Sequence, residues 1–230
     1  MAYKRASKDA LGCDSLYHMV ATTTSAGASL KQRRMARTKA EIQRCALKLF
    51  GKQGFEETTV SQIAAAAEVS PMTVFRYFAT KEDIVLWDDF DQTLVAEIRR
   101  APRNKDVITL VATVLLTSLT ETGEEARMAM FARLELAART PALRARGLDN
   151  LYQTQQIVAS ALGSANRTDQ LRNSVAVGAC LAAVSAALFQ WAMGQGKDDP
   201  VALAREAFIV IGANVGGHHN ERRKTRQRRS

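Results

Sequence analysis

The chain has 230 residues, of which 47% are apolar and only 6% aromatic, and its formal net charge is +9. This length suits one or two domains with a sizeable core, and abundant alanine and leucine without alternating β-branched segments predict an all-α fold. Three widely spaced cysteines, Cys13, Cys45 and Cys180, argue against a disulfide framework and favour free thiols in a reducing cytoplasm.

The positive charge is concentrated at the two ends of the sequence. Residues 1–80 hold 12 basic and 6 acidic side chains, residues 218–230 hold 6 basic and 1 acidic, and residues 81–217 have a net charge of −2. Basic ends are typical of proteins that bind phosphate groups. We expect residues 1–34 and 218–230 to be disordered basic segments, for which DNA contact and simple solvation both remain open. No apolar stretch near the N-terminus has the length of a signal-peptide core, so we expect a cytoplasmic protein.

The first predicted helix runs from about Arg37 to Gln53. Apolar residues from Ile42 to Phe50 recur at helical spacing on one face, and Gly54 is suited to end the helix. This helix is expected to support the segment that follows.

The stretch Thr58 to Lys81 predicts two short helices joined by a tight turn. Thr59 and Gln62 have the spacing of a capping box, and Ser70 followed by Pro71 is a favourable start for the second helix. Thr80 can cap a third helix. Two such helices form the helix-turn-helix arrangement, in which the second helix enters the DNA major groove. An ordinary helical hairpin with a mixed surface is the alternative.

The outer face of the second helix carries side chains suited to reading DNA. Arg76 can pair with O6 and N7 of guanine, and Thr73 can bond a base edge or touch a thymine methyl group. Tyr77 and Lys81 can hold phosphates, which positions the helix without reading sequence. Val74 and Phe78 lie on the other side and predict its buried face.

The region from about Arg37 to Val85 resembles the DNA-binding segment of the tetracycline-repressor (TetR) family. The resemblance rests on LKLFGKQGFEETTV, on the Ile63–Ala64 pair and on VSPMTVFRYFATKEDIV. It implies a three-helix DNA-binding domain over residues 35–80 and a helical ligand-binding and dimerisation domain over residues 81–217. Phe75 departs from the family, which more often has tyrosine there, and so lacks one possible phosphate bond. The DNA-binding residues expected on these grounds are Arg37, Thr59, Ser70, Met72, Thr73, Phe75, Arg76, Tyr77 and Lys81.

A continuous helix is predicted from Lys81 to about Arg100, and the resemblance implies that it links the two domains. Within it, the stretch from Trp87 to Asp91 holds three carboxylates, which favours a solvated acidic face over a metal site because no histidine or fourth acid is near in sequence. No metal or cofactor is expected. Five further helices are predicted at about Asp106–Thr120, Glu124–Arg139, Ala142–Leu162, Asp169–Met193 and Val201–Gly216.

Residues Asn173 to Gly196 contain no charge, and this run is long enough to span a membrane. Interruption by Ser174, Gly178 and Gln190 favours a buried soluble helix instead. Small residues there, including Gly178, Ala182, Ala186 and Ala187, permit close packing. The resemblance implies that the last two helices form the four-helix bundle of a homodimer.

The resemblance also implies an effector pocket in the C-terminal domain. Its expected lining is Phe90, Leu94, Met128, Phe131, Leu134 and Trp191, with Met193 as a further candidate, although each is also typical of an ordinary core. Few charges there favour an apolar or amphipathic small molecule; an acyl thioester, with its polar end near Arg133, is one hypothesis.

The sequence has no catalytic motif of the GxSxG, HExxH, Walker or GxGxxG type, so no catalytic residue is expected. We therefore interpret the chain as a homodimeric regulator, most simply a repressor, that binds palindromic double-stranded DNA and is released by a small effector. A non-specific nucleoid-type DNA-binding protein without an effector is the alternative, and an enzyme on a helical scaffold is a third hypothesis.

Overall fold

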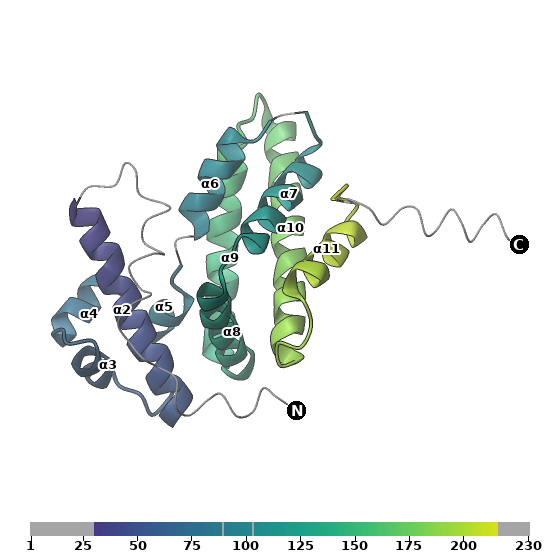
Figure 1. Ribbon diagram of the computed structural model, residues 1–230. Coiled ribbons are helices and arrows are strands. Elements are labelled where there is room, and N and C mark those ends of the chain that lie inside the picture. Colours follow the sequence, from purple (N-terminus) through teal and green to yellow (C-terminus); the bar gives the residue numbers. More distant parts are fainter. Residues whose placement is uncertain (1–29, 89, 103, 216–230) are drawn as a thin grey trace, which may run out of the picture.

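The computed structural model describes residues 30–88, 90–102 and 104–215, and gives no side-chain detail for residues 90–92. The described residues contain α-helices and no strand, which confirms the all-α prediction (Figure 1). The helices are α2 (Leu30–Gln53), α3 (Val60–Ala66), α4 (Pro71–Tyr77), α5 (Lys81–Leu86), α6 (Phe90–Arg100), α7 (Val107–Thr120), α8 (Glu124–Arg139), α9 (Pro141–Ala161), α10 (Arg167–Met193) and α11 (Pro200–Val210).

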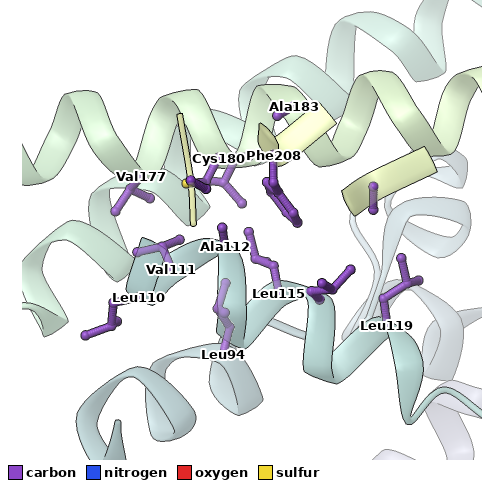
Figure 2. Close-up of a cluster of buried hydrophobic side chains, with 14 of the residues drawn as sticks. Leu94, Leu110, Val111, Ala112, Leu115, Leu119, Val177, Cys180, Ala183 and Phe208 are labelled. Atoms are coloured by element: carbon purple, nitrogen blue, oxygen red, sulfur yellow. The ribbon is translucent and has the colours of Figure 1, made fainter. Parts of the chain in front are cut away.

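Two apolar cores organise the molecule. The N-terminal core joins α2, α3 and α4 to α5, whose Ile84 and Val85 are fully buried. The C-terminal core joins α6, α7, α10 and α11, and Figure 2 shows Phe208 facing Leu115 and Cys180 within it. Because α5 packs in the N-terminal core, the change from one core to the other falls after Leu86. The sequence predicts this change at Lys81.

The helix caps predicted in the helix-turn-helix segment are confirmed. Thr59 accepts a hydrogen bond from the Gln62 backbone N–H while the Gln62 side chain accepts one from the Thr59 backbone. Ser70 caps α4, and Pro71 occupies its first turn. Thr80 and Asp83 form a second capping box at α5. At each short helix the cap satisfies one of the free N–H groups, which fixes where α3, α4 and α5 begin.

Helix α2 begins at Leu30, which corrects two predictions. The first helix was expected at Arg37, and residues up to 34 were assigned to a disordered arm. The segment from Lys31 to Ala36 contains no glycine or proline and is rich in good helix formers, so the helix extends toward the N-terminus. The rest of the predicted arm and the predicted tail lie outside the described residues.

The predicted helix from Lys81 to Arg100 is two helices. α5 ends at Leu86, Trp87 has extended backbone angles (φ −64°, ψ 130°), and α6 starts at Phe90. The residues around Trp87 include no glycine or proline that would end a helix. The break depends instead on side chains distant in sequence, which donate hydrogen bonds to the carbonyl groups left free. α11 also ends at Val210, short of the predicted Gly216, because Gly212 turns the chain with φ 84°.

Helix α10 is long and apolar enough to cross a membrane, and 44% of its most apolar window is buried within the protein. Its buried residues include Val177, Cys180 and Leu181 of the C-terminal core. Burial raises the pKa of the Cys180 thiol to about 12, so that this cysteine is a neutral core residue at physiological pH. Gly178 faces α9, where an added Cβ would lie 2.8 Å from Gln155 Nε2.

The cap of α7 provides a test of the C-terminal core. Asp106 Oδ1 accepts a hydrogen bond from the Thr109 backbone at 2.9 Å, and this bond lowers the pKa of the Asp106 carboxyl below its ordinary value of 3.8. Asp106→Ala should lower the free energy of unfolding by about 1 kcal/mol, and Asp106→Asn, which keeps an acceptor, by much less. Urea unfolding at pH 7 measures both values.

The same cap should give a pH dependence of known sign. A depressed folded-state pKa contributes stability that is complete above the ordinary pKa of 3.8 and is lost as the pH falls through the lower folded value. Asp106→Asn should lack this component of the acid transition. Identical acid transitions for the two proteins would contradict the assignment.

Candidate DNA-binding surface and effector region

The outer face of α4 is formed by side chains spaced three and four residues apart. Met72 is 76% exposed and Phe75 is 54% exposed, and Arg76 is exposed beside them. The opposite side of the helix is anchored by Val74, with Phe78 just beyond its end, and both are buried in the N-terminal core. An exposed Met and Phe on a helix held this firmly are free to contact thymine methyl groups and other apolar parts of a groove.

The remaining predicted residues of α4 lie on its flanks. Thr73 is half-buried, and its hydroxyl lies 2.9 Å from the Ser70 hydroxyl. The Arg76 guanidinium lies 5.1 Å from the ring centroid of Tyr77, so the ring restrains the arginine. Ser70 and Thr59 use their hydroxyl groups to cap α4 and α3. Their position at helix N-termini still leaves backbone N–H groups that favour an anion.

Lys81 has a structural role that the sequence did not reveal. Its ammonium group donates to the Phe55 carbonyl at 2.9 Å and to the Glu56 carbonyl at 3.3 Å, and it lies 4.7 Å from the Phe55 ring centroid. Of its three N–H groups one is left over for a phosphate. Lys81 therefore ties the start of α5 to the loop before α3.

The first half of α2 is a basic helical surface. Lys31, Arg33, Arg34 and the predicted Arg37 are exposed, and the first acidic residue of the helix is Glu41. In Figure 1 this end of α2 lies at the edge of the molecule remote from α10 and α11. The arginines were visible in the sequence, but their arrangement on a helix was not.

The junction between α5 and α6 is held by side chains from both cores. The Gln43 side-chain amide donates to the carbonyl groups of Ile84 at 2.8 Å and Trp87 at 2.7 Å. Arg133 of α8 donates to the same Trp87 carbonyl at 2.8 Å and lies 3.6 Å from the Asp88 carboxylate. Burial lowers the pKa of Arg133, and Asp88 partly opposes that effect.

Only part of the predicted effector pocket is assembled. Phe131 and Trp191 meet edge to face with ring centroids 5.3 Å apart, and Leu134 is half-buried. Leu94, however, is fully buried in the C-terminal core, and the side chain of Phe90 lies outside the described part. Met128 and Met193, which the sequence predicts in the lining of the pocket, are 58% and 73% exposed. Arg133, which the sequence predicts near the polar end of an effector, has its guanidinium bound to the Trp87 carbonyl at the α5–α6 junction.

Two buried nitrogen donors near this aromatic pair have no acceptor among the residues that the structure describes. They are the Trp191 indole Nε1 and the Arg127 Nε, and Arg127 lies one helical turn before Phe131 on α8. Leaving a buried donor unsatisfied costs about 1–3 kcal/mol. Such a site favours a molecule that brings an oxygen acceptor and an apolar body. The two unpaired donors are apparent only from the tertiary structure, because neither residue is unusual in the sequence.

Two open hollows lie elsewhere on the molecule. One of about 300 Å³ is bordered by Lys105, Thr117 and Arg205, and one of about 400 Å³ by Val95, Arg99 and Ile157. Neither is bordered by the predicted pocket residues. Within the described ranges, no group of three His, Cys, Asp or Glu side chains could hold a metal ion; Asp89 and the side chain of Asp91, from the acidic cluster, are not described.

Helices α10 and α11 leave an apolar strip uncovered. Leu171, Val175 and Met193 are 66%, 61% and 73% exposed on α10, and Ile209 and Val210 are 47% and 85% exposed on α11. Together with the exposed Ala182 and Ala186, the α10 positions recur at helical spacing along one face. We call these residues the α10–α11 apolar strip.

Comparison with known proteins agrees with this arrangement. Residues 42–86 match the model of the bacterial regulatory proteins of the tetR family, and residues 105–216 match the MftR C-terminal domain. The regulator TcmR of Streptomyces glaucescens is 45% identical over 86 residues, and the match spans 36% of this chain and 38% of TcmR. A Mycobacterium tuberculosis protein described as the mycofactocin biosynthesis transcriptional regulator MftR is 27% identical over 191 residues. The match covers 80% of this chain and 93% of MftR.

The fold agrees with a solved structure as well. The fatty acid degradation regulator FadR of Bacillus halodurans superposes with a TM-score of 0.51 at 20% identity, over 76% of this chain and 94% of that one. At this identity the likeness concerns the fold alone. Because the two matches cover both domains, the chain belongs to the tetR family of bacterial transcriptional regulators, which bind DNA.

Proposed function

We propose that this protein is a cytoplasmic repressor that binds a palindromic operator as a homodimer and is released by a small amphipathic effector. The observation that carries the proposal is the exposed face of α4, with Met72, Phe75 and Arg76 side by side on a helix capped and anchored at both ends. A reading helix needs such a rigid mount, since base contacts depend on its register in the groove.

Phosphate contacts are assigned to three places around α4. The capping ends at Thr59 and Ser70 offer backbone N–H groups, Lys81 offers its remaining N–H, and the exposed start of α2 offers Lys31 to Arg37. These contacts carry no sequence information and make affinity dependent on salt. They position α4 so that Arg76 reaches a guanine edge.

The dimer is assigned to the α10–α11 apolar strip. Exposed Val175 and Val210 would leave apolar area in water in a monomer, whereas a second copy related by a two-fold axis would cover it. To read successive major grooves, the two-fold dimer must present its two α4 helices on one side of the duplex, about 34–36 Å apart.

The effector is assigned to the α8–α10 interface around Phe131 and Trp191. Arg127 Nε and Trp191 Nε1 would each donate a hydrogen bond to a carbonyl, carboxylate or thioester oxygen of the effector, and Phe131 would contact its acyl chain. An effector releases DNA only if it binds better to a dimer with unsuitable spacing, and such coupling typically changes operator affinity about 5–150-fold.

Selection of bound sites from random DNA at physiological salt tests the operator. We expect a palindrome whose half-sites are spaced by one turn or a close multiple. Arg76→Ala should cost about 1–3 kcal/mol at one base position, whereas Lys81→Ala should weaken all sequences alike and also lower protein stability. A steep salt dependence with no enriched site would favour the nucleoid-type alternative. An equal loss on every sequence for Arg76→Ala would remove its assigned role.

Light scattering tests the dimer. Val175→Glu should give monomers and abolish binding to the palindrome, because it puts a charge in the apolar strip. Met128→Glu is the matched control, since Met128 is comparably exposed but lies on α8. Monomers of wild type, or dimers of the Val175 variant, would argue against this interface.

Calorimetry with dodecanoyl-CoA, dodecanoate and CoA tests the effector region. Trp191→Phe should weaken binding by about 0.5–1.5 kcal/mol through loss of one hydrogen bond. Because the indole is buried, the smaller ring also leaves a cavity and lowers the stability of the free protein, so the affinities are compared at a temperature where both proteins are folded. Trp87→Phe, at the other tryptophan, is the control. Unchanged affinity in Trp191→Phe would place the effector elsewhere.

A further inference from the structure

Helix α5 is held at its N-terminal end by the C-terminal domain. Arg146 of α9 donates from Nε to Asp83 Oδ1 at 3.0 Å. The other oxygen of the same carboxylate accepts the Thr80 backbone N–H at 3.1 Å. One carboxylate therefore joins α9 to the cap of α5, immediately after the reading helix.

The other end of α5 is held by the same domain through a different arginine. The Trp87 carbonyl accepts from Arg133 of α8 at 2.8 Å and from Gln43 of α2 at 2.7 Å. A single oxygen therefore receives one hydrogen bond from each domain. Movement of α8 relative to α2 must break or bend one of the two.

Between these two contacts, the inner face of α5 packs on apolar side chains of α8 and α9. Ile84 and Val85 of α5 are fully buried together with Leu143 of α9 and Ala137 of α8, both next to the α8–α9 corner. In Figure 1, α5 lies between α2 and α9. With both ends and its inner face attached, α5 follows this corner as a rigid body.

From α5 the attachment continues to the reading helix. Phe78, just after α4, is buried against Trp87 with ring centroids 6.2 Å apart. Lys81 ties α5 to the carbonyl groups of Phe55 and Glu56 ahead of α3. The orientation of α5 therefore determines the orientation of α4.

We propose that Arg146 and Arg133 are positioning residues that fix α4 relative to the dimerising helices and thereby select the spacing of the two DNA half-sites. The proposal rests on the operator binding proposed above. The same contacts connect the proposed effector region to α4 through α8. On α8, Arg133 follows Phe131 by two residues, about 200° around the helix, so α8 contacts Trp191 on one side and the α5 junction on the other.

Arg146 gives the cleaner experiment because its side chain is 42% exposed and its substitution should leave the fold intact. The affinities of wild type and Arg146→Gln are measured for the selected palindrome, for the same half-sites moved apart or together by one or two base pairs, and for an isolated half-site. We expect the preference for the selected spacing to fall at least about fivefold, the lower end of typical coupling, while half-site affinity is unchanged. Arg146→Lys should restore part of the preference.

Asp149→Asn is the matched control. Arg146 also pairs with Asp149 at 3.0 Å, so this variant removes that ion pair and leaves the contact with Asp83 in place. Its spacing preference should equal that of wild type. Asp83→Asn keeps an acceptor for the cap, and should weaken the preference without adding to the effect of Arg146→Gln in the double variant.

Unchanged spacing preference in Arg146→Gln would overturn the proposal. So would an equal loss on the palindrome and on the isolated half-site, because that pattern means damage to the reading helix itself. If wild type shows no preferred spacing at all, the operator function fails and this inference fails with it. A wild-type preference that Arg146→Gln retains instead overturns the inference alone.

Discussion

The early end of α5 leaves carbonyl groups inside the protein that must find donors. The last carbonyl groups of a helix have no partner in their own helix, and burying them unpaired is costly. Here Gln43 supplies hydrogen bonds to Ile84 and Trp87, and Arg133 supplies a second one to Trp87. Side chains of both domains thus stabilise the break between α5 and α6. The position of the N-terminal domain on the C-terminal domain depends on these hydrogen bonds.

The N-terminal domain is small, and its own core would give it limited stability alone. Its core is completed by Ala137 and Leu143, which belong to α8 and α9. The N-terminal domain therefore completes its core only when it packs on the C-terminal domain. Such packing is consistent with a regulator in which the reading helix responds to the C-terminal domain. A DNA-binding domain held only by a flexible linker could not transmit a change in the spacing of the two reading helices.

The C-terminal domain combines a well-packed core with unsatisfied features at its margins. The core around Phe208, Leu115 and Cys180 is closed and apolar. By contrast, within the described part of the chain the indole of Trp191 and the Nε of Arg127 lack acceptors, and the residues of the α10–α11 apolar strip are exposed. Native proteins rarely leave buried donors unpaired or large apolar strips in water; the proposed effector would satisfy the donors, and the proposed partner subunit would cover the strip.

The sequence by itself determined the all-α fold, the start of α3, α4 and α5, and the face of α4 that carries Arg76. These features depend on caps and periodicity within a few residues, such as Thr59 with Gln62 and Thr80 with Asp83. Only the tertiary structure decided the break at Trp87, the structural bonds of Lys81, and the exposure of Met128. The partners involved are far apart in the chain: Gln43 and Arg133 lie more than 40 residues from Trp87 on either side. No local pattern records such contacts, because they arise only when the two domains pack together.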